Sequence, residues 1–341
     1  MWGHVAACAF GWVQHARNVE TGEEVAIKFI PLGPRFFHRY VEREIMNHRR
    51  LGHPHIVGLK EVFLTPQVLG IVMEYVGGGN LQSYVERAGR LPEWQARCFF
   101  QQLILALRYC HDALGIAHRD IKLGNILLNT KYQVPILKIC DFGYSKSTQY
   151  GSVPKTRVGT AAYISPEVAL SAGDTAYDTE KADVWSAGVT LFCMLAGRYP
   201  FTDADNAVRL RCIQTLGAEQ VERALEALPA DVSPGCRALL RGVLRVRPEE
   251  RLALQQVVED PWFQLYLPDP SRMGAGAPPK DAQGAEEIRG ILAQAEVYSK
   301  TRAARDDLEG EIIDQDVDDI FNEIEPDTLD RHPHRAQARM D

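Results

Sequence analysis

The sequence predicts an α+β fold of two lobes, a small β-rich N-terminal lobe and a larger helical C-terminal lobe, followed by a C-terminal extension. Two apolar runs near the start of the chain, 25–30 and 69–75, are typical of buried strands. Helical patterns dominate after the glycine run 77–79, and region 265–282 is rich in proline and glycine. With 341 residues, 45% of them hydrophobic, the chain can build a core in each lobe.

The N-terminal lobe, about residues 1–75, combines strands with one amphipathic helix. Lys28 interrupts the first apolar run and is its one charged side chain. The pattern over 39–51 predicts a helix with Glu44 close to its apolar stripe, which is formed by Val41, Ile45 and His48. The second apolar run ends at three consecutive glycines, a break that suits a hinge between the lobes.

The C-terminal lobe, about residues 76–264, is predicted to be mainly helical. One helix begins after Leu91-Pro92-Glu93, and its apolar face is formed by Phe99, Phe100, Leu103, Leu107 and Cys110. A second, largely apolar helix is expected over 182–196. Pro261-Trp262-Phe263 is interpreted as the end of a single globular domain that spans 1–264.

The extension divides into a linker at 265–282, a short helix at 283–299 and an acidic tail at 300–341. The helix has too few apolar positions to be stable alone, so we expect it to dock on the body through Ile288, Ile291, Leu292 and Ala295. Residues 306–330 hold twelve Asp or Glu and no Lys or Arg, which leaves −7 − (−12) = +5 for the remainder. The tail is expected to be disordered, with interleaved apolar residues that favour binding to the body or to a basic partner.

Cysteine usage and hydropathy exclude several classes of protein. The seven cysteines are scattered and never spaced as Cys-x-x-Cys, which argues against a disulfide framework or a zinc site. No run of about 18 apolar residues is present to span a bilayer, and Met1-Trp2-Gly3-His4 does not open a secretory signal. We therefore expect an intracellular protein, cytoplasmic or nuclear or both, with neither a membrane nor a nucleic-acid partner.

Two short motifs combine the residue types that phosphoryl transfer requires. Residues 118–125 read His-Arg-Asp-Ile-Lys-Leu-Gly-Asn, and Asp-Phe-Gly follows at 141–143. They supply a base in Asp120, a phosphate-facing lysine in Lys122, and two hard oxygen ligands for Mg²⁺ in Asn125 and Asp141. Since this reaction mainly requires orientation, metal binding and charge neutralisation, the motifs predict a phosphotransferase that uses Mg²⁺ and ATP.

The rest of the expected ATP site comes from the N-terminal lobe and the hinge. Lys28 on its strand is predicted to hold the α and β phosphates, oriented by an ion pair with Glu44. The adenine is expected to bind the backbone of Glu74 to Val76 and to lie between the apolar side chains of Val13, Ala26, Met73 and Leu127. Any one of these residues alone is more often structural, and only their common order indicates a site.

The motifs resemble those of the eukaryotic protein kinase superfamily over about residues 1–264. Four stretches are similar to the plant sucrose-non-fermenting-related kinases of the second group, which are serine/threonine kinases that respond to osmotic stress and abscisic acid. These stretches are Lys138-Ile-Cys-Asp-Phe-Gly-Tyr-Ser-Lys-Ser147, Ile71-Val-Met-Glu-Tyr75, Asn47-His-Arg49 and Asp183-Val-Trp-Ser-Ala-Gly-Val-Thr190. The resemblance implies a two-lobed protein-kinase fold and a serine/threonine protein kinase.

The resemblance also implies roles for residues around the catalytic set. Asp120 would accept the proton of the substrate hydroxyl, and Thr160 would bond Asp120 and Lys122 at the edge of the peptide groove. For Thr160, and also for Glu167, Arg251 and Asp183, a structural role is the main interpretation. Glu167 is expected to pair with Arg251 in a buried salt bridge, and Asp183 to accept backbone hydrogen bonds that brace the catalytic loop.

The phosphate-binding loop departs from the family pattern. A kinase loop reads Gly-x-Gly-x-x-Gly-x-Val, and the matching positions here are Ala6, Cys8, Gly11 and Val13. Side chains at positions 6 and 8 add bulk where glycine lets the main chain close over the nucleotide. Few residues precede Ala6 to form a first strand, so either a truncated start or reduced activity is expected.

Activation by phosphorylation between Asp141 and Glu167 is a further implication of the family. Ser152 and Thr156 align with its phosphorylated positions, and a phosphate on Thr156 is expected to pair with Arg119 and order the loop. The phosphate would come from an upstream kinase or from a second copy of this chain. In the family the helix at 283–299 packs on the helix that carries Glu44, and the acidic tail binds phosphatases of the 2C type.

Two positions bear on substrate choice. Relatives that prefer basic substrates carry acidic residues where this chain has Asn80 and Gly124, so we expect a weaker requirement for arginine in protein substrates.

Two rival functions stay open. One rival is a pseudokinase scaffold with little or no phosphotransfer, which the altered loop favours. The other, a small-molecule kinase, is disfavoured by segment 160–167, which suits a peptide substrate.

Overall fold

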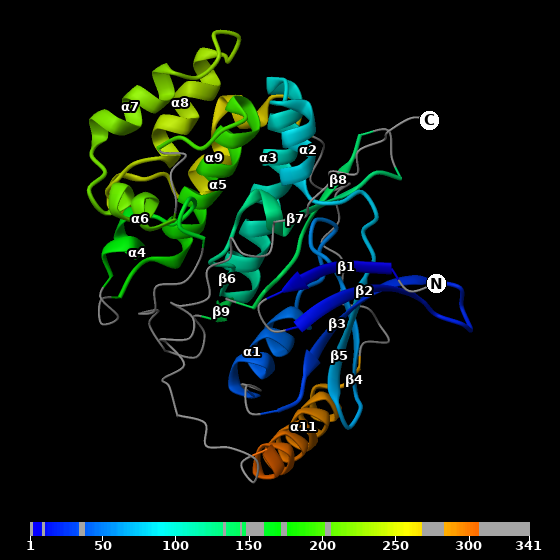
Figure 1. Cartoon of the computed structure of the whole chain (residues 1–341). Coiled ribbons are helices and arrows are strands. Elements are labelled where there is room, and N and C mark those ends of the chain that lie inside the picture. Colours follow the sequence, from blue (N-terminus) through cyan, green and yellow to red (C-terminus); the bar gives the residue numbers. More distant parts are fainter. Residues whose placement is uncertain are drawn as a thin grey trace, which may run out of the picture. The chain divides into compact units, whose positions relative to one another are not determined.

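The computed structural model describes residues 3–8, 11–33, 38–131, 134–143, 145–147, 160–171, 176–201, 206–267 and 283–306. These form two compact units (Figure 1). One unit comprises 1–36, 62–72 and 286–341 and contains most of a β-sheet. The other comprises 37–61 and 73–285 and contains most of the helices. The α+β class and the division into a β-rich and a helical part are as predicted.

A five-stranded sheet with the order β1-β2-β3-β5-β4 dominates the first unit. Its strands are β1 (Gly3–Cys8), β2 (Gly11–Arg17), β3 (Glu24–Pro31), β4 (Leu59–Leu64) and β5 (Val68–Glu74). The predicted strands at 25–30 and 69–75 therefore fall in β3 and β5. β1 pairs with β2 from Gly3 opposite His15 to Cys8 opposite Gly11, so a first strand does form on the short segment before the loop.

Helix α1 (His38–His48) buries the apolar stripe that the sequence predicts. Val41, Ile45 and His48 are 4%, 0% and 3% exposed. The helix groups with the helical unit, whereas the sequence assigned it to the N-terminal lobe. The segment after the helix explains this difference, because Val57 N donates to Ile139 O at 2.9 Å and Ile139 N to His55 O at 2.8 Å.

The helical unit is built around α3 (Glu93–Arg108) and α5 (Thr179–Ala196), which lie side by side in its core. Asp178 caps α5 by accepting a hydrogen bond from Lys181 N. The remaining helices are α2 (Leu81–Ala88), α4 (Pro166–Leu170), α6 (Asn206–Gln214), α7 (Ala218–Glu226), α8 (Pro234–Val243), α9 (Leu254–Glu259) and α10 (Pro261–Gln264). The predicted apolar face of α3 is buried, with Phe99, Phe100, Leu103 and Leu107 each 0% exposed.

A π-helical turn and two small two-stranded sheets also belong to this unit. A π-helical turn, Tyr109–Ala113, continues α3, so Cys110 is buried but lies beyond the helix predicted to carry it. One sheet pairs β6 (Ile116–Ala117) with β9 (Lys146–Ser147), and the other is a hairpin of β7 (Ile126–Asn129) and β8 (Ile136–Ile139). The catalytic motif therefore lies between β6 and β7, and Asp-Phe-Gly follows β8.

Helix α11 (Ala285–Asp306) forms where a docking helix is expected and runs beyond its predicted end at 299. Glu296 and Lys300 pair at 2.7 Å one turn apart, which supports the longer helix. Ile288, Leu292 and Ala295 are 0%, 1% and 0% exposed, while Ile291 is only partly buried. The helix groups with the sheet unit, and the acidic segment after it lies outside the described residues. In the described part of the chain, no helix combines the length and apolarity needed to cross a membrane.

Candidate active site

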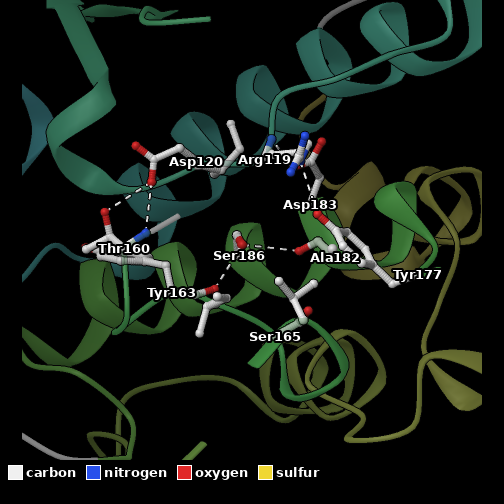
Figure 2. A pocket seen from close by; sticks show the side chains of 12 residues that line it. Arg119, Asp120, Thr160, Tyr163, Ser165, Tyr177, Ala182, Asp183 and Ser186 are labelled. Atoms are coloured by element: carbon white, nitrogen blue, oxygen red, sulfur yellow. Dashed lines mark hydrogen bonds between the residues drawn. The ribbon is translucent and has the colours of Figure 1, made fainter. Parts of the chain in front are cut away.

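Asp120 is the centre of a hydrogen-bonded network in the loop between β6 and β7. The residue is 4% exposed, and its Oδ1 accepts hydrogen bonds from Thr160 N and Thr160 Oγ1, both at 3.1 Å. Its Oδ2 lies 3.0 Å from Lys122 Nζ and 2.8 Å from Asn125 Nδ2. Lys122 Nζ also donates to Thr160 Oγ1 at 2.7 Å. The structure thus brings Asp120, Lys122 and Thr160 together, as the sequence predicts. Figure 2 shows the bonds between Asp120 and Thr160.

Asn125 and Asp141 present oxygen atoms that suit Mg²⁺. Asn125 Nδ2 donates to both Asp120 O at 2.9 Å and Asp120 Oδ2, so the amide oxygen is the atom of this side chain that could bind a metal. Cys140 N and Cys140 Sγ donate to Asn125 O at 3.0 and 3.3 Å, so the segment before Asp141 is tied to this residue. Asp141 adopts a positive φ of 62°, and its Oδ1 accepts from Gly143 N at 3.1 Å. Two oxygen donors fit Mg²⁺, which usually keeps water and phosphate ligands as well.

The Asp183 side chain of α5 fixes the backbone at the start of the catalytic loop. Its carboxylate is fully buried and accepts from His118 N at 2.9 Å and Arg119 N at 2.8 Å. His111 Nε2, carried by the π-helical turn, lies 2.7 Å from the same carboxylate. Burial lowers the pKa of His111, but the hydrogen bond and charge of Asp183 outweigh it and raise that pKa overall. The sequence predicts the role of Asp183 but not that of His111.

Arg119 lies between Asp183 and a tyrosine that the sequence does not single out. Its backbone adopts φ 70°, an uncommon conformation for a residue with a side chain. Its Nε donates to Tyr177 Oη at 3.1 Å, as Figure 2 shows. Burial is the main cause of a raised pKa at Tyr177, so the hydroxyl keeps its proton. A lone tyrosine before a helix cap has no recognisable motif, which explains why sequence reasoning missed it.

An aromatic column connects α1 with the catalytic loop. The ring of Phe142 stacks on His48 at a centroid distance of 5.3 Å and meets the edge of His118 at 4.8 Å. His48 Nε2 lies 2.7 Å from Val57 O, and His118 Nε2 lies 3.1 Å from Cys140 O. The middle residue of Asp-Phe-Gly is therefore held from both sides, which fixes the backbone next to Asp141.

Glu167 and Arg251 form the buried salt bridge that the sequence predicts. Arg251 NH1 donates to Glu167 Oε1 at 2.7 Å and NH2 to Oε2 at 2.9 Å, in a bidentate arrangement. The arginine side chain is 0% exposed and also donates to the carbonyls of Lys181, Arg245 and Val246. All of these contacts are structural, and they fix Glu167 at the end of segment 160–167.

The sheet unit carries four residues of the predicted ATP site. Val13 pairs with Lys28 and His15 with Ala26 across β2 and β3, and Lys28 is 6% exposed. Gly11 has φ 154°, and a Cβ there would lie 1.9 Å from Phe29 O, so this position requires glycine.

Glu44 is 7% exposed in the helical unit, and a Cβ added to Gly143 would lie 3.5 Å from its Oε2. The ion pair between Lys28 and Glu44 stays a prediction.

The hinge follows β5 directly. Met73 and Glu74 are partly exposed and Val76 is buried. Leu127 alternates with the buried Ile126 and Leu128 in β7 and is partly exposed, and its contact with adenine stays a prediction. Gly78 N donates to Leu128 O at 3.0 Å, and a Cβ at Gly78 would lie 2.1 Å from that oxygen. The predicted phosphorylation sites Ser152 and Thr156 lie outside the described residues.

Comparison with known proteins agrees with this geometry. A protein-family model described as "Protein kinase domain" matches residues 5–263. The chain is 42% identical to Serine/threonine-protein kinase SRK2D of Arabidopsis thaliana over 331 residues, which cover 93% of this chain and 88% of that protein. It is 44% identical to Serine/threonine-protein kinase SAPK7 of Oryza sativa subsp. japonica over 302 residues, 85% of this chain and 81% of that protein. These comparisons give no support to a non-catalytic scaffold.

Proposed function

We propose, from the premise that this chain belongs to the protein kinase family, that it transfers the γ-phosphate of ATP to serine and threonine hydroxyls of proteins. The contacts of Asp120 support this most strongly. One carboxylate reaches Lys122, Asn125 and Thr160 within 3.1 Å, which joins base, phosphate ligand and metal ligand in one network. A structural carboxylate would not require all three partners.

The chain's own residues divide the work of the reaction. Asp120 orients the substrate hydroxyl and accepts its proton, while Lys122 neutralises charge on the phosphoryl group during transfer. Asn125 and Asp141 would hold Mg²⁺, which supplies the charge that offsets the phosphates. Lys28 holds the α and β phosphates and Glu44 orients it. Asp183 keeps His118 and Arg119 in place, so Asp120 is presented in one conformation.

Regulation is proposed to follow the stress-activated plant kinases that the chain resembles. Phosphorylation at Thr156, and also at Ser152, by an upstream kinase or by a second copy of this chain would activate the enzyme in osmotic-stress or abscisic-acid signalling. Arg119 is the proposed partner of the phosphate at Thr156, since its guanidinium lies beside the catalytic loop. A 2C-type phosphatase is the proposed partner of the acidic tail, and the cytoplasm or nucleus the proposed compartment.

Substrate choice is proposed to depend little on arginine. The Asn80 side chain caps α2 by accepting from Ser83 N at 2.9 Å, so it is engaged within the protein. Gly124 has no side chain, and the nearest atom to a Cβ there would be Gln82 Oε1 at 3.5 Å. Neither position offers a carboxylate to a basic substrate. A peptide array dominated by arginine three positions before the phosphorylated residue would refute this preference.

The decisive experiment compares the wild-type chain with Asp120→Asn. Purified protein is incubated with labelled ATP and Mg²⁺, and label in serine, threonine and tyrosine is separated after hydrolysis. We expect labelled serine and threonine, with a rate about 10³-fold lower in Asp120→Asn because the proton acceptor is lost. Thermal unfolding of both proteins is the control for folding. A wild-type protein without Mg²⁺-dependent labelling, or a variant of equal rate, would contradict the proposal.

A further inference from the structure

A partly buried ion pair lies beside the hinge and is not part of the chemistry described so far. Lys138 Nζ of β8 lies 2.8 Å from Glu74 Oε2 at the end of β5. The lysine side chain is 11% exposed and the glutamate side chain 32% exposed. A lysine this deeply buried requires a partner, because its charge is otherwise removed from water without compensation.

Glu74 is held by several bonds at once. Its Oε2 also accepts from Gly58 N at 3.3 Å, and its backbone N donates to Gly58 O at 2.8 Å. Lys138 Nζ makes a longer contact of 3.5 Å with Ile56 O. The ion pair therefore holds Glu74, the first residue of the hinge, by its side chain. The hydrogen bond to Gly58 O holds the same residue by its main chain.

The strand that carries Lys138 is itself immobilised. His55 Nδ1 lies 3.0 Å from Leu137 O, and Leu137 N donates to Gln102 Oε1 of α3 at 2.8 Å. His55 and Gln102 are 5% and 8% exposed. Bonds from two other elements thus hold the backbone on one side of Lys138, and the ammonium group projects from a fixed base.

The position of Lys138 in the β7–β8 hairpin relates it to the expected adenine surface. Lys138 pairs directly with Leu127 across the hairpin, and opposite residues of an antiparallel pair project from the same face. Leu127 is the predicted apolar floor for the ring, and Glu74 begins the backbone edge that would bind it. Lys138 therefore pairs with Leu127 and bonds Glu74, two residues of the expected adenine site.

We infer that Lys138 is a positioning residue for adenine recognition: it holds Glu74, and through Glu74 the backbone of the hinge, in the geometry that binds the base. This inference rests on the proposed function. A buried ion pair is seldom more stabilising than apolar residues of the same size, so stability alone does not account for it. A fixed hinge does, because a pre-organised backbone loses less freedom when the nucleotide binds.

The test measures Mg-ADP binding to the purified full chain by calorimetry, in the wild type and in Lys138→Met, Glu74→Gln and the double variant. Lys138→Met keeps the apolar stem and leaves Glu74 able to reach water, so it should fold. Arg241→Gln, which removes the more exposed ion pair with Glu222 at 2.8 Å, is the matched control. Steady-state assays give KM for ATP, KM for a peptide and kcat.

We expect Lys138→Met and Glu74→Gln each to weaken Mg-ADP binding about 5-fold, and the double variant to bind no more weakly than either, because all three lack the same pair. KM for ATP should rise in parallel, while KM for peptide, kcat and the Arg241→Gln control stay within about 2-fold of the wild type. Wild-type affinity in Lys138→Met, or losses that multiply in the double variant, would overturn the inference. A wild-type chain that does not bind nucleotide would instead refute the proposed function.

Discussion

The catalytic loop and the β1–β2 hairpin differ in how their conformation is determined. In the loop, side chains fix the geometry, since Asp183 alone accepts two backbone hydrogen bonds and faces His111. In the hairpin, the backbone pairs from Gly3 opposite His15 to Cys8 opposite Gly11, although two of the three family glycines are replaced. The motif residues whose side chains act match the family pattern, while two of the three loop glycines, which act through the backbone, are replaced.

This contrast indicates which changes the protein tolerates. A β-hairpin forms its ladder with almost any side chain, so Ala6 and Cys8 are compatible with β1. No other residue can replace a buried carboxylate that accepts several hydrogen bonds, because its partners would lose their acceptor inside the protein. Substitutions in the catalytic loop should therefore affect both stability and kcat, whereas substitutions in the hairpin should affect the kinetics with ATP.

The largest expected effect is that of Asp183→Asn. The amide cannot satisfy His118 N, Arg119 N and His111 together, and we expect a loss of about 3 kcal/mol in the free energy of unfolding and about 10²-fold in kcat. Chemical denaturation and peptide phosphorylation measure the two. Glu222→Gln, in an exposed ion pair, should cost less than about 1 kcal/mol. Equal effects of both variants would show that the hydrogen bonds of Asp183 do not determine the geometry of the catalytic loop.

Gly11→Ala tests a position in the hairpin where the backbone excludes a side chain. Its Cβ would lie 1.9 Å from Phe29 O at a φ of 154°, so β2 must shift against β3. We expect kcat/KM for ATP to fall about 10-fold with little change in KM for peptide, because the shift displaces the residues near Val13. A fully active Gly11→Ala protein would show that the hairpin does not contact the nucleotide.

Ala6→Gly/Cys8→Gly restores the family pattern and should have a smaller, opposite effect. The main chain gains room to approach the phosphates, so we expect KM for ATP to fall about 3-fold. The measurement is steady-state kinetics at several ATP concentrations, with Val19→Ala, at a site 98% exposed, as the control. An unchanged KM would mean that the substituted residues do not limit nucleotide binding.

His55→Asn should weaken the pH dependence of stability. Burial and the charge of Lys138 lower the pKa of His55 from 6.5 to about 4, although its bond to Leu137 O opposes the shift. The unfolded chain then binds more protons between these values, so wild-type stability is complete above about pH 6.5 and falls as the pH decreases. At pH 5 we expect the variant to lose about 2 kcal/mol less than the wild type, relative to pH 7.5. Identical denaturation curves across this range would contradict the assignment.

Much of the fold and the catalytic set could be predicted from the sequence because motif spacing and helical periodicity are local signals. Asp120, Lys122 and Thr160 meet as expected, and α1 buries the predicted stripe. His111 and Tyr177 were not found, since their partners lie 72 and 58 positions away and no pattern records such contacts.

The grouping of elements was also harder to predict than the elements themselves. Proximity in sequence placed α1 with the strands, whereas hydrogen bonds from 55–57 to β8 connect the following segment with the helices. The end of α11 lies past 299 because Lys, Arg and Ala residues favour helix in a stretch that was interpreted by its charge. Local composition does not record long-range pairing or the exact point where a helix ends.

The π-helical turn Tyr109–Ala113 makes this part of the chain unusually intolerant of insertions and deletions. A π turn accommodates one more residue than a regular turn, and each residue rotates a helix by about 100°. Deletion of a single residue here would rotate the imidazole of His111 away from α5, even though no side chain in the site had been altered. Length, and not only identity, is therefore under constraint in this short segment, and tags or barcodes for cell experiments should be inserted elsewhere.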